Sequence, residues 1–167
     1  MSGIADSEVR LLAMLDRLGI AYDLLEHEAV FTVEESGALH ARIPGSHTKN
    51  LFLKDAGGRF WLVSAPHDAW IDLKALPSSI GSKKVSFGKT DDMKRLLGVT
   101  PGSVTPLAAI NDADHNVTVI IDSRLAASNR VNVHPLRNTA TIGMAGADLV
   151  AFLQANGHGV AIVDLTN

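Results

Sequence analysis

Apolar residues recur every three or four positions near the start of the chain. The series is Val9, Leu12, Leu15 and Leu18. It follows a polar segment at 6–8 and is closed by Gly19, which together predict an amphipathic helix. Thr32 and Glu35 have the spacing of a capping box, which predicts a second helix that ends near residues 43–45.

From residue 49 the apolar pattern changes to a period of two. Apolar runs at 51–53 and 60–63 flank the turn residues 55–58, which predicts a β-hairpin. The remaining pattern predicts further strands at 22–25, 106–110, 117–121, 139–144 and 160–165, and further helices at 72–76, 90–97 and 147–154. We therefore expect one α+β domain over residues 1–167, with a mixed or largely antiparallel, strongly curved sheet.

Composition removes several kinds of chemistry. The 167 residues include no cysteine, which excludes disulfides, thiolate nucleophiles and cysteine-ligated zinc, and the 46% apolar content excludes a disordered chain. The seven histidines are scattered, so we expect structural or surface roles for most of them and no metal site. Apolar runs fall short of the ~20 residues of a membrane span. No signal peptide is visible at the start, so we expect a cytoplasmic protein.

Charge is unevenly distributed along the chain. Residues 1–48 carry three basic and eight acidic side chains, whereas residues 49–95 carry nine basic and five acidic ones. The middle segment could therefore face a polyanion although the whole chain has a net charge of -3. Charge alone leaves scattered, solvated lysines as an equal alternative.

Four segments combine polar groups with restricted backbone geometry, namely 26–32, 44–50, 98–106 and 131–139. Lys49 and Asn50 lie at the start of an apolar strand, where they could bind an anion or a carbonyl group of a ligand. Alternatively, Lys49 could be an ordinary lysine at the beginning of a strand. Gly102 lies in a proline-bounded loop whose amides could hold an oxyanion, or the loop could be a plain turn. His134 precedes a proline and could be functional or a satisfied buried histidine. Segment 26–32 favours core packing over a pocket wall.

Three of these blocks together resemble a known family. The blocks are KNLFLK at 49–54, GSVTP at 102–106 and NVHPLRNTAT at 132–141, with VFTVEE at 30–35 ahead of them. They resemble the YbaK/ProRS-editing superfamily of aminoacyl-tRNA deacylases, and within it the free-standing Ala-tRNA(Pro) deacylases. The resemblance covers nearly the whole chain. It implies a single α/β domain with a mixed, barrel-like sheet surrounded by helices.

The resemblance also implies an activity and a set of residues. The activity is hydrolysis of the ester of mischarged tRNA, without a metal or an organic cofactor. The family's functional positions fall on Lys49, Asn50, Gly102 and His134, which we expect to be catalytic. We further expect the substrate to contact a second group of residues, namely Phe31, Thr32, Ser103, Asn138 and Thr139. Arg137 receives no role from the resemblance.

Partners and alternatives follow from the same resemblance. The expected partner is the acceptor stem and CCA end of a mischarged tRNA, and prolyl-tRNA synthetase is a second candidate. Two other readings remain, a non-catalytic module that binds tRNA or a synthetase, and a deacylase for Cys, Ser or Thr. Sequence-specific DNA binding is not expected because the most basic helix, at 90–97, carries Asp91 and Asp92.

Overall fold

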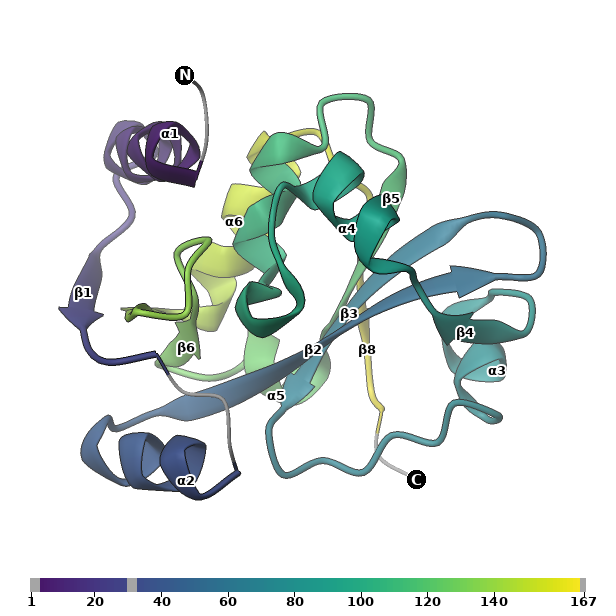
Figure 1. Cartoon of the computed structure of the whole chain (residues 1–167), viewed down its shortest axis with the longest axis horizontal. Coiled ribbons are helices and arrows are strands. Elements are labelled where there is room, and N and C mark those ends of the chain that lie inside the picture. Colours follow the sequence, from purple (N-terminus) through teal and green to yellow (C-terminus); the bar gives the residue numbers. More distant parts are fainter. Residues whose placement is uncertain (1–3, 30–32, 166–167) are drawn as a thin grey trace.

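The computed structural model describes residues 4–29 and 33–165, which form a sheet with helices packed around it (Figure 1). The first half contains α1 (Ile4–Arg17), β1 (Tyr22–Glu26), α2 (Val33–Arg42), β2 (Ser46–Asp55), β3 (Phe60–Pro66), α3 (Leu76–Ile80) and β4 (Val85–Phe87). The second half contains α4 (Thr90–Leu97), the 3-10 helices η1 (Pro101–Ser103) and η2 (Pro106–Asn111), β5 (Val117–Asp122), α5 (Ser123–Ala126), β6 (Val131–Val133), β7 (Ala140–Met144), α6 (Gly146–Ala155) and β8 (Val160–Val163).

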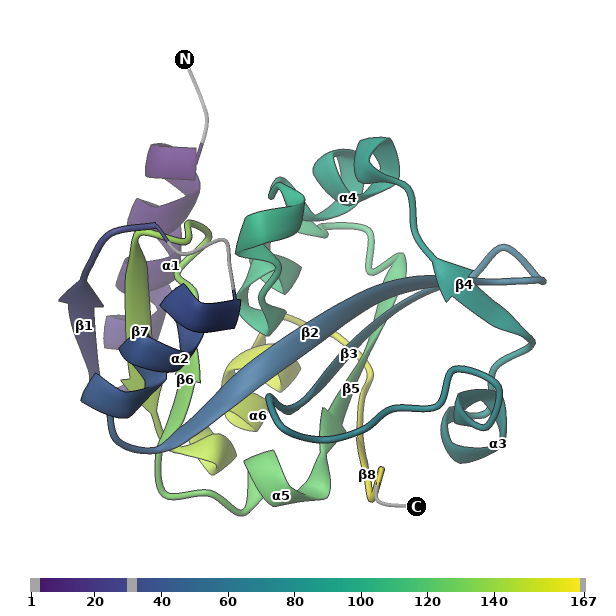
Figure 2. The same ribbon diagram turned by 60° about the horizontal axis from the view of Figure 1, so that its bottom comes forward.

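The sheet mixes parallel and antiparallel pairs in the order β1-β7-β6-β2-β3-β5-β8, with β4 also paired to β2. Strand β2 connects its two parts. Its first residues pair in parallel with β6, its middle pairs antiparallel with β3, and its end pairs with β4. Figures 1 and 2 show β2 running diagonally from α2 towards β4. The expected single domain with a mixed sheet surrounded by helices is confirmed.

The central strands β2, β3 and β5 pack against apolar side chains on both faces. Phe52 and Leu62 belong to a large apolar cluster that also contains side chains of α1, α4, η2 and α6. The alternate residues Leu53, Trp61 and Val63 belong to a second cluster that contains Leu76 of α3. Because neighbouring residues of a strand point to opposite faces, two consecutive side chains of β2 reach two different environments.

Most of the predicted elements are present, and two predictions are wrong. The apolar run 106–110 is not a strand but the helix η2, because Pro106 fixes a helical φ and the Thr105 hydroxyl caps the first turn by accepting from the Leu107 amide. A short apolar run does not distinguish a strand from a buried helix. The helix expected at 72–76 begins only at Leu76.

The second predicted helix is present as α2. Its predicted cap at Thr32 lies outside the described residues, as does Phe31. Across residues 4–29 and 33–165, no helix combines the length and apolar character that crossing a membrane requires.

Candidate functional site

Lys49 and Asn50 lie next to each other on β2 but point to opposite faces of the sheet. The Lys49 ammonium group donates a hydrogen bond to the carbonyl oxygen of Ala69, in the segment that follows β3. One of its three N–H groups is therefore used within the protein. Lys49 is half-buried and retains donors for an anionic or carbonyl oxygen of a ligand.

Asn50 joins the sheet to the loop that carries Gly102. The Ser64 hydroxyl donates to Asn50 Oδ1 at 2.6 Å, and Asn50 Nδ2 donates to the Val104 carbonyl at 3.2 Å. Ser64 is fully buried, so its hydroxyl fixes the orientation of the Asn50 amide. The Asn50 side chain therefore links the end of the 101–104 loop to strand β3.

The two candidate residues of that loop have different environments. Gly102 is exposed on helix η1, whereas Ser103 is buried. The Ser103 amide donates to the Thr100 carbonyl at 2.9 Å, so it is already paired and is not a free oxyanion donor. Of the two predicted residues in this loop, Gly102 has the backbone that a ligand can approach.

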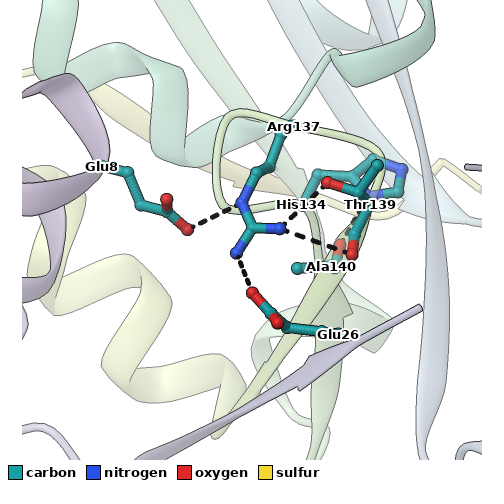
Figure 3. A network of polar contacts seen from close by, with 6 residues as sticks. All are labelled: Glu8, Glu26, His134, Arg137, Thr139 and Ala140. Atoms are coloured by element: carbon teal, nitrogen blue, oxygen red, sulfur yellow. Dashed lines mark hydrogen bonds and ion pairs between the residues drawn. The ribbon is translucent and has the colours of Figure 1, made fainter. Parts of the chain in front are cut away.

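His134 begins the turn that joins β6 to β7. Its Nδ1 lies 3.2 Å from the Ala140 carbonyl oxygen (Figure 3). Because a carbonyl only accepts, this contact requires a proton on Nδ1 and leaves Nε2 of the neutral ring as an acceptor. Burial lowers the pKa of His134, with a smaller lowering from nearby His27. The imidazole is therefore neutral at pH 7 and can accept a proton or a hydrogen bond through Nε2.

The same turn carries Asn138 and Thr139. Both are half-buried. The Thr139 hydroxyl accepts a hydrogen bond from Arg137 Nη1 at 2.9 Å, and the Thr139 carbonyl accepts from the His27 amide. Thr139 is thus tied to the protein in the absence of substrate, and its role in substrate binding stays a prediction.

Three histidines meet beside the start of β2. The ring of His40, on α2, stacks on the ring of His47 at a centroid distance of 4.0 Å, and His67 approaches His40 edge-on at 4.6 Å. Burial lowers the pKa of His40 to about 4, assisted by His47, His67 and His134. Among the described residues, no group of three or more His, Cys, Asp or Glu side chains has the arrangement of a metal site.

This histidine cluster could not be found in the sequence. His40 and His67 are far apart along the chain. The pairing of β2 with β3 brings His67 beside His47, and α2 places His40 against both rings. His47 and Lys49 are two residues apart on one strand, so both point to the same face. His134 lies near enough to lower the pKa of His40. The structure therefore gathers His134, the cluster and Lys49 on one side of β2, and Asn50 with the Gly102 loop on the other.

Comparisons with known proteins agree with this geometry and sequence pattern. The model of the aminoacyl-tRNA editing domain matches residues 27–152. The prolyl-tRNA editing protein ProX of Acetoanaerobium sticklandii is 39% identical over 161 residues, covering 96% of this chain and 98% of that protein. The prolyl-tRNA synthetase associated domain-containing protein 1 of Mus musculus is 36% identical over 168 residues, covering 96% and 99%.

A solved structure gives the same fold. The structure of a candidate trans-editing enzyme for prolyl-tRNA synthetase superposes with a TM-score of 0.69 at 20% identity, covering 95% of this chain and 96% of that one. The chain therefore belongs to the aminoacyl-tRNA editing domain family. Membership of this family identifies it as an aminoacyl-tRNA deacylase, which confirms the resemblance read from the sequence.

Proposed function

We propose that this protein is a free-standing trans-editing enzyme that hydrolyses mischarged tRNA(Pro), with Ala-tRNA(Pro) as its preferred substrate. The observation that carries the proposal is the end-to-end similarity to a protein named for prolyl-tRNA editing, which leaves no large part of either chain unmatched. Editing of this kind has a physical reason. A synthetase pocket that accepts proline discriminates weakly against a smaller side chain, by about 1–3 kcal/mol per methylene.

The reaction needs a placed water and a stabilised oxyanion. The water oxygen bonds to the ester carbonyl carbon and gives a tetrahedral oxyanion. The water oxygen loses a proton as this bond forms. When the tetrahedral oxyanion collapses, the bond from the carbonyl carbon to the ribose oxygen breaks, and the ribose oxygen takes up a proton in place of the one that the water lost. The products are the free amino acid and the tRNA with its terminal hydroxyl restored. Because the ester is already activated, no protein nucleophile is required.

Each site residue has a role in this proposal, and contacts support those of His134 and Lys49. His134, with Nε2 as an acceptor, orients the attacking water or the α-amino group of the substrate. Lys49 uses its remaining N–H groups on the terminal phosphate or the ester carbonyl. Asn50 holds the loop of Gly102 in place, and stabilisation of the oxyanion by the backbone of Gly102 stays a prediction, because this loop lies on the other side of β2 from Lys49 and His134. A ribose hydroxyl of the substrate assists proton transfer.

The acceptor end of the tRNA is the partner that the exposed groups fit. Lys54 and Arg95 both lie over the ring of Phe60, at 5.5 and 5.9 Å from its centroid, and place positive charge beside the β2–β3 hairpin. Trp70 is 72% exposed and directly follows Ala69, the residue that receives the Lys49 ammonium group. An exposed indole at this place can stack on an unpaired base of the CCA end. Binding should therefore weaken with salt.

A substrate panel tests the proposal directly. Hydrolysis is measured for tRNA(Pro) charged with Ala, Cys, Ser or Pro, and for tRNA(Ala) charged with Ala as a control. We expect rapid release of Ala from tRNA(Pro) and slow release from the two correctly charged tRNAs. A preference for Cys or Ser on tRNA(Pro) would replace Ala in the proposal, and hydrolysis of none would leave a tRNA-binding or synthetase-binding module.

The role of Lys49 has its own test. Lys49→Ala should abolish Ala-tRNA(Pro) hydrolysis, because it removes the ammonium group that the contact with Ala69 positions for the terminal phosphate or the ester carbonyl. Arg17→Ala removes a positive charge from the exposed end of α1 and is the matched control. Full turnover by Lys49→Ala would show that this assignment is wrong.

A further inference from the structure

The turn that carries His134 has an unfavourable backbone conformation. Leu136, two residues after His134, has a φ of 74°, in the left-handed region that residues other than glycine rarely adopt. Its side chain is fully buried in the main apolar cluster. A left-handed conformation at a leucine costs on the order of 1–2 kcal/mol, so other contacts must hold the turn in this shape.

Arg137 supplies those contacts (Figure 3). Its Nε donates to Glu8 Oε1 of α1 at 3.0 Å, and its Nη2 donates to Glu26 Oε1 of β1 at 2.9 Å. Its Nη1 donates to the Thr139 hydroxyl at 2.9 Å. All three nitrogens of one guanidinium group are therefore used, and they join the turn to two elements from the start of the chain.

The hydrogen bond of His134 depends on the same turn. His134 Nδ1 donates a hydrogen bond to the carbonyl of Ala140, and Arg137 donates one to the hydroxyl of the preceding residue, Thr139. Both hydrogen bonds therefore hold the end of the same short turn. The side chain of Arg137 is only 26% exposed, and that of Glu8 is 18% exposed. Such a partly buried ion pair is screened less by solvent than a surface pair.

We propose that Arg137 is a positioning residue for His134, which clamps the 134–140 turn to α1 and β1 so that the Nε2 of His134 faces the substrate. The inference rests on the proposed function, because it concerns the same site. In this proposal Arg137 acts through His134 and not by contact with the water or the ester. The α1 helix thereby becomes part of the support of the site, although it carries none of the predicted catalytic residues.

Replacing Arg137 by Gln removes the charge and the fork of donors. A loosened histidine should lower kcat by about 10- to 100-fold, because misplacing a catalytic group by about 1 Å costs this much. KM for the tRNA should change less than twofold. Arg137→Lys keeps the charge but cannot reach all three partners, so it should recover part of the rate.

A double-mutant cycle separates positioning from general damage. In a His134→Ala background, Arg137→Gln should have no further effect on kcat, because the histidine through which it acts is gone. Arg130→Gln is the matched control, since Arg130 also clamps β1, through Asp23, but lies ahead of β6. It should reduce thermal stability without the loss of kcat. Equal losses from Arg137→Gln with and without His134 would overturn the proposal.

An NMR measurement keeps the test independent of the substrate. In histidine-labelled wild-type protein, the His134 ring should show the tautomer protonated at Nδ1 and a pKa below its ordinary value. In Arg137→Gln that pKa should rise towards the ordinary value, because the ring becomes more solvated. An unchanged His134 signal would overturn the inference, whereas failure of every tRNA substrate with a changed signal would reject only the proposed function.

Discussion

The burial of His40 beside His47 and His67 should make the protein less stable as the pH falls. The folded pKa of His40 is about 4, below the ordinary value of 6.5, with burial as the main cause. The unfolded chain therefore takes up the proton first, between these two values. The stabilising contribution is complete above pH 6.5 and is lost progressively as the pH falls towards 4.

The size of the effect follows from the two pKa values. Between pH 8 and pH 5, linkage gives a loss of about 2 kcal/mol in the free energy of unfolding for His40 alone. Because His40 is partly exposed, screening by solvent reduces this to about 1 kcal/mol. Burial also lowers the pKa values of His47, His134 and His158, so the total loss in the wild-type protein should be larger.

Urea denaturation at both pH values isolates the contribution of His40. His40→Phe keeps an aromatic ring against His47 but cannot be protonated, so its loss between pH 8 and pH 5 should be smaller than the wild-type loss by about 1 kcal/mol. Comparing the two pH values cancels any change in packing that the substitution causes. If the wild-type protein and the variant lose the same stability on acidification, the lowered pKa assigned to His40 is wrong.

Two further predictions concern stability away from the site. Asp55 is buried and accepts hydrogen bonds from the Gly57 amide and the Trp61 indole, so Asp55→Ala should lower the free energy of unfolding by about 3 kcal/mol in urea denaturation. A loss below about 1 kcal/mol would contradict this role. A Cβ atom at Gly146 would lie 1.9 Å from the Leu125 carbonyl oxygen, so Gly146→Ala should cost at least about 2 kcal/mol. Gly37→Ala, with open space around it in α2, is the control and should raise the melting temperature.

Local patterns predicted those parts of the fold whose signal lies within one segment. The amphipathic period and Gly19 correctly predicted α1, and the alternating runs around residues 55–58 correctly predicted the β2–β3 hairpin. The apolar run at 106–110 predicts a strand but forms a helix, because the helical φ imposed by Pro106 and the cap from Thr105 outweigh its apolar character. The short strands β4 and β6 gave no periodic signal, since three residues do not complete a pattern.

For the candidate site, too, the sequence predicted the residues but not the contacts between them. Lys49, Asn50, Gly102 and His134 could be selected from sequence blocks, and the chain belongs to the family that these blocks indicated. The opposite directions of Lys49 and Asn50 were implicit in the period of a strand. The partners of these residues were not, because the bond from Asn50 to Val104 joins positions far apart in the chain.

The sequence by itself determined the class of chemistry and the family, because the absence of cysteine and the ordered polar blocks can be read without knowing which segments are in contact. Only the tertiary structure decided how these blocks are supported. It placed three dispersed histidines in one cluster, and it gave Arg137 partners from α1, β1 and its own turn. Contacts of this kind depend on the pairing and packing of distant segments, and a local pattern of residues does not predict which segments will be neighbours.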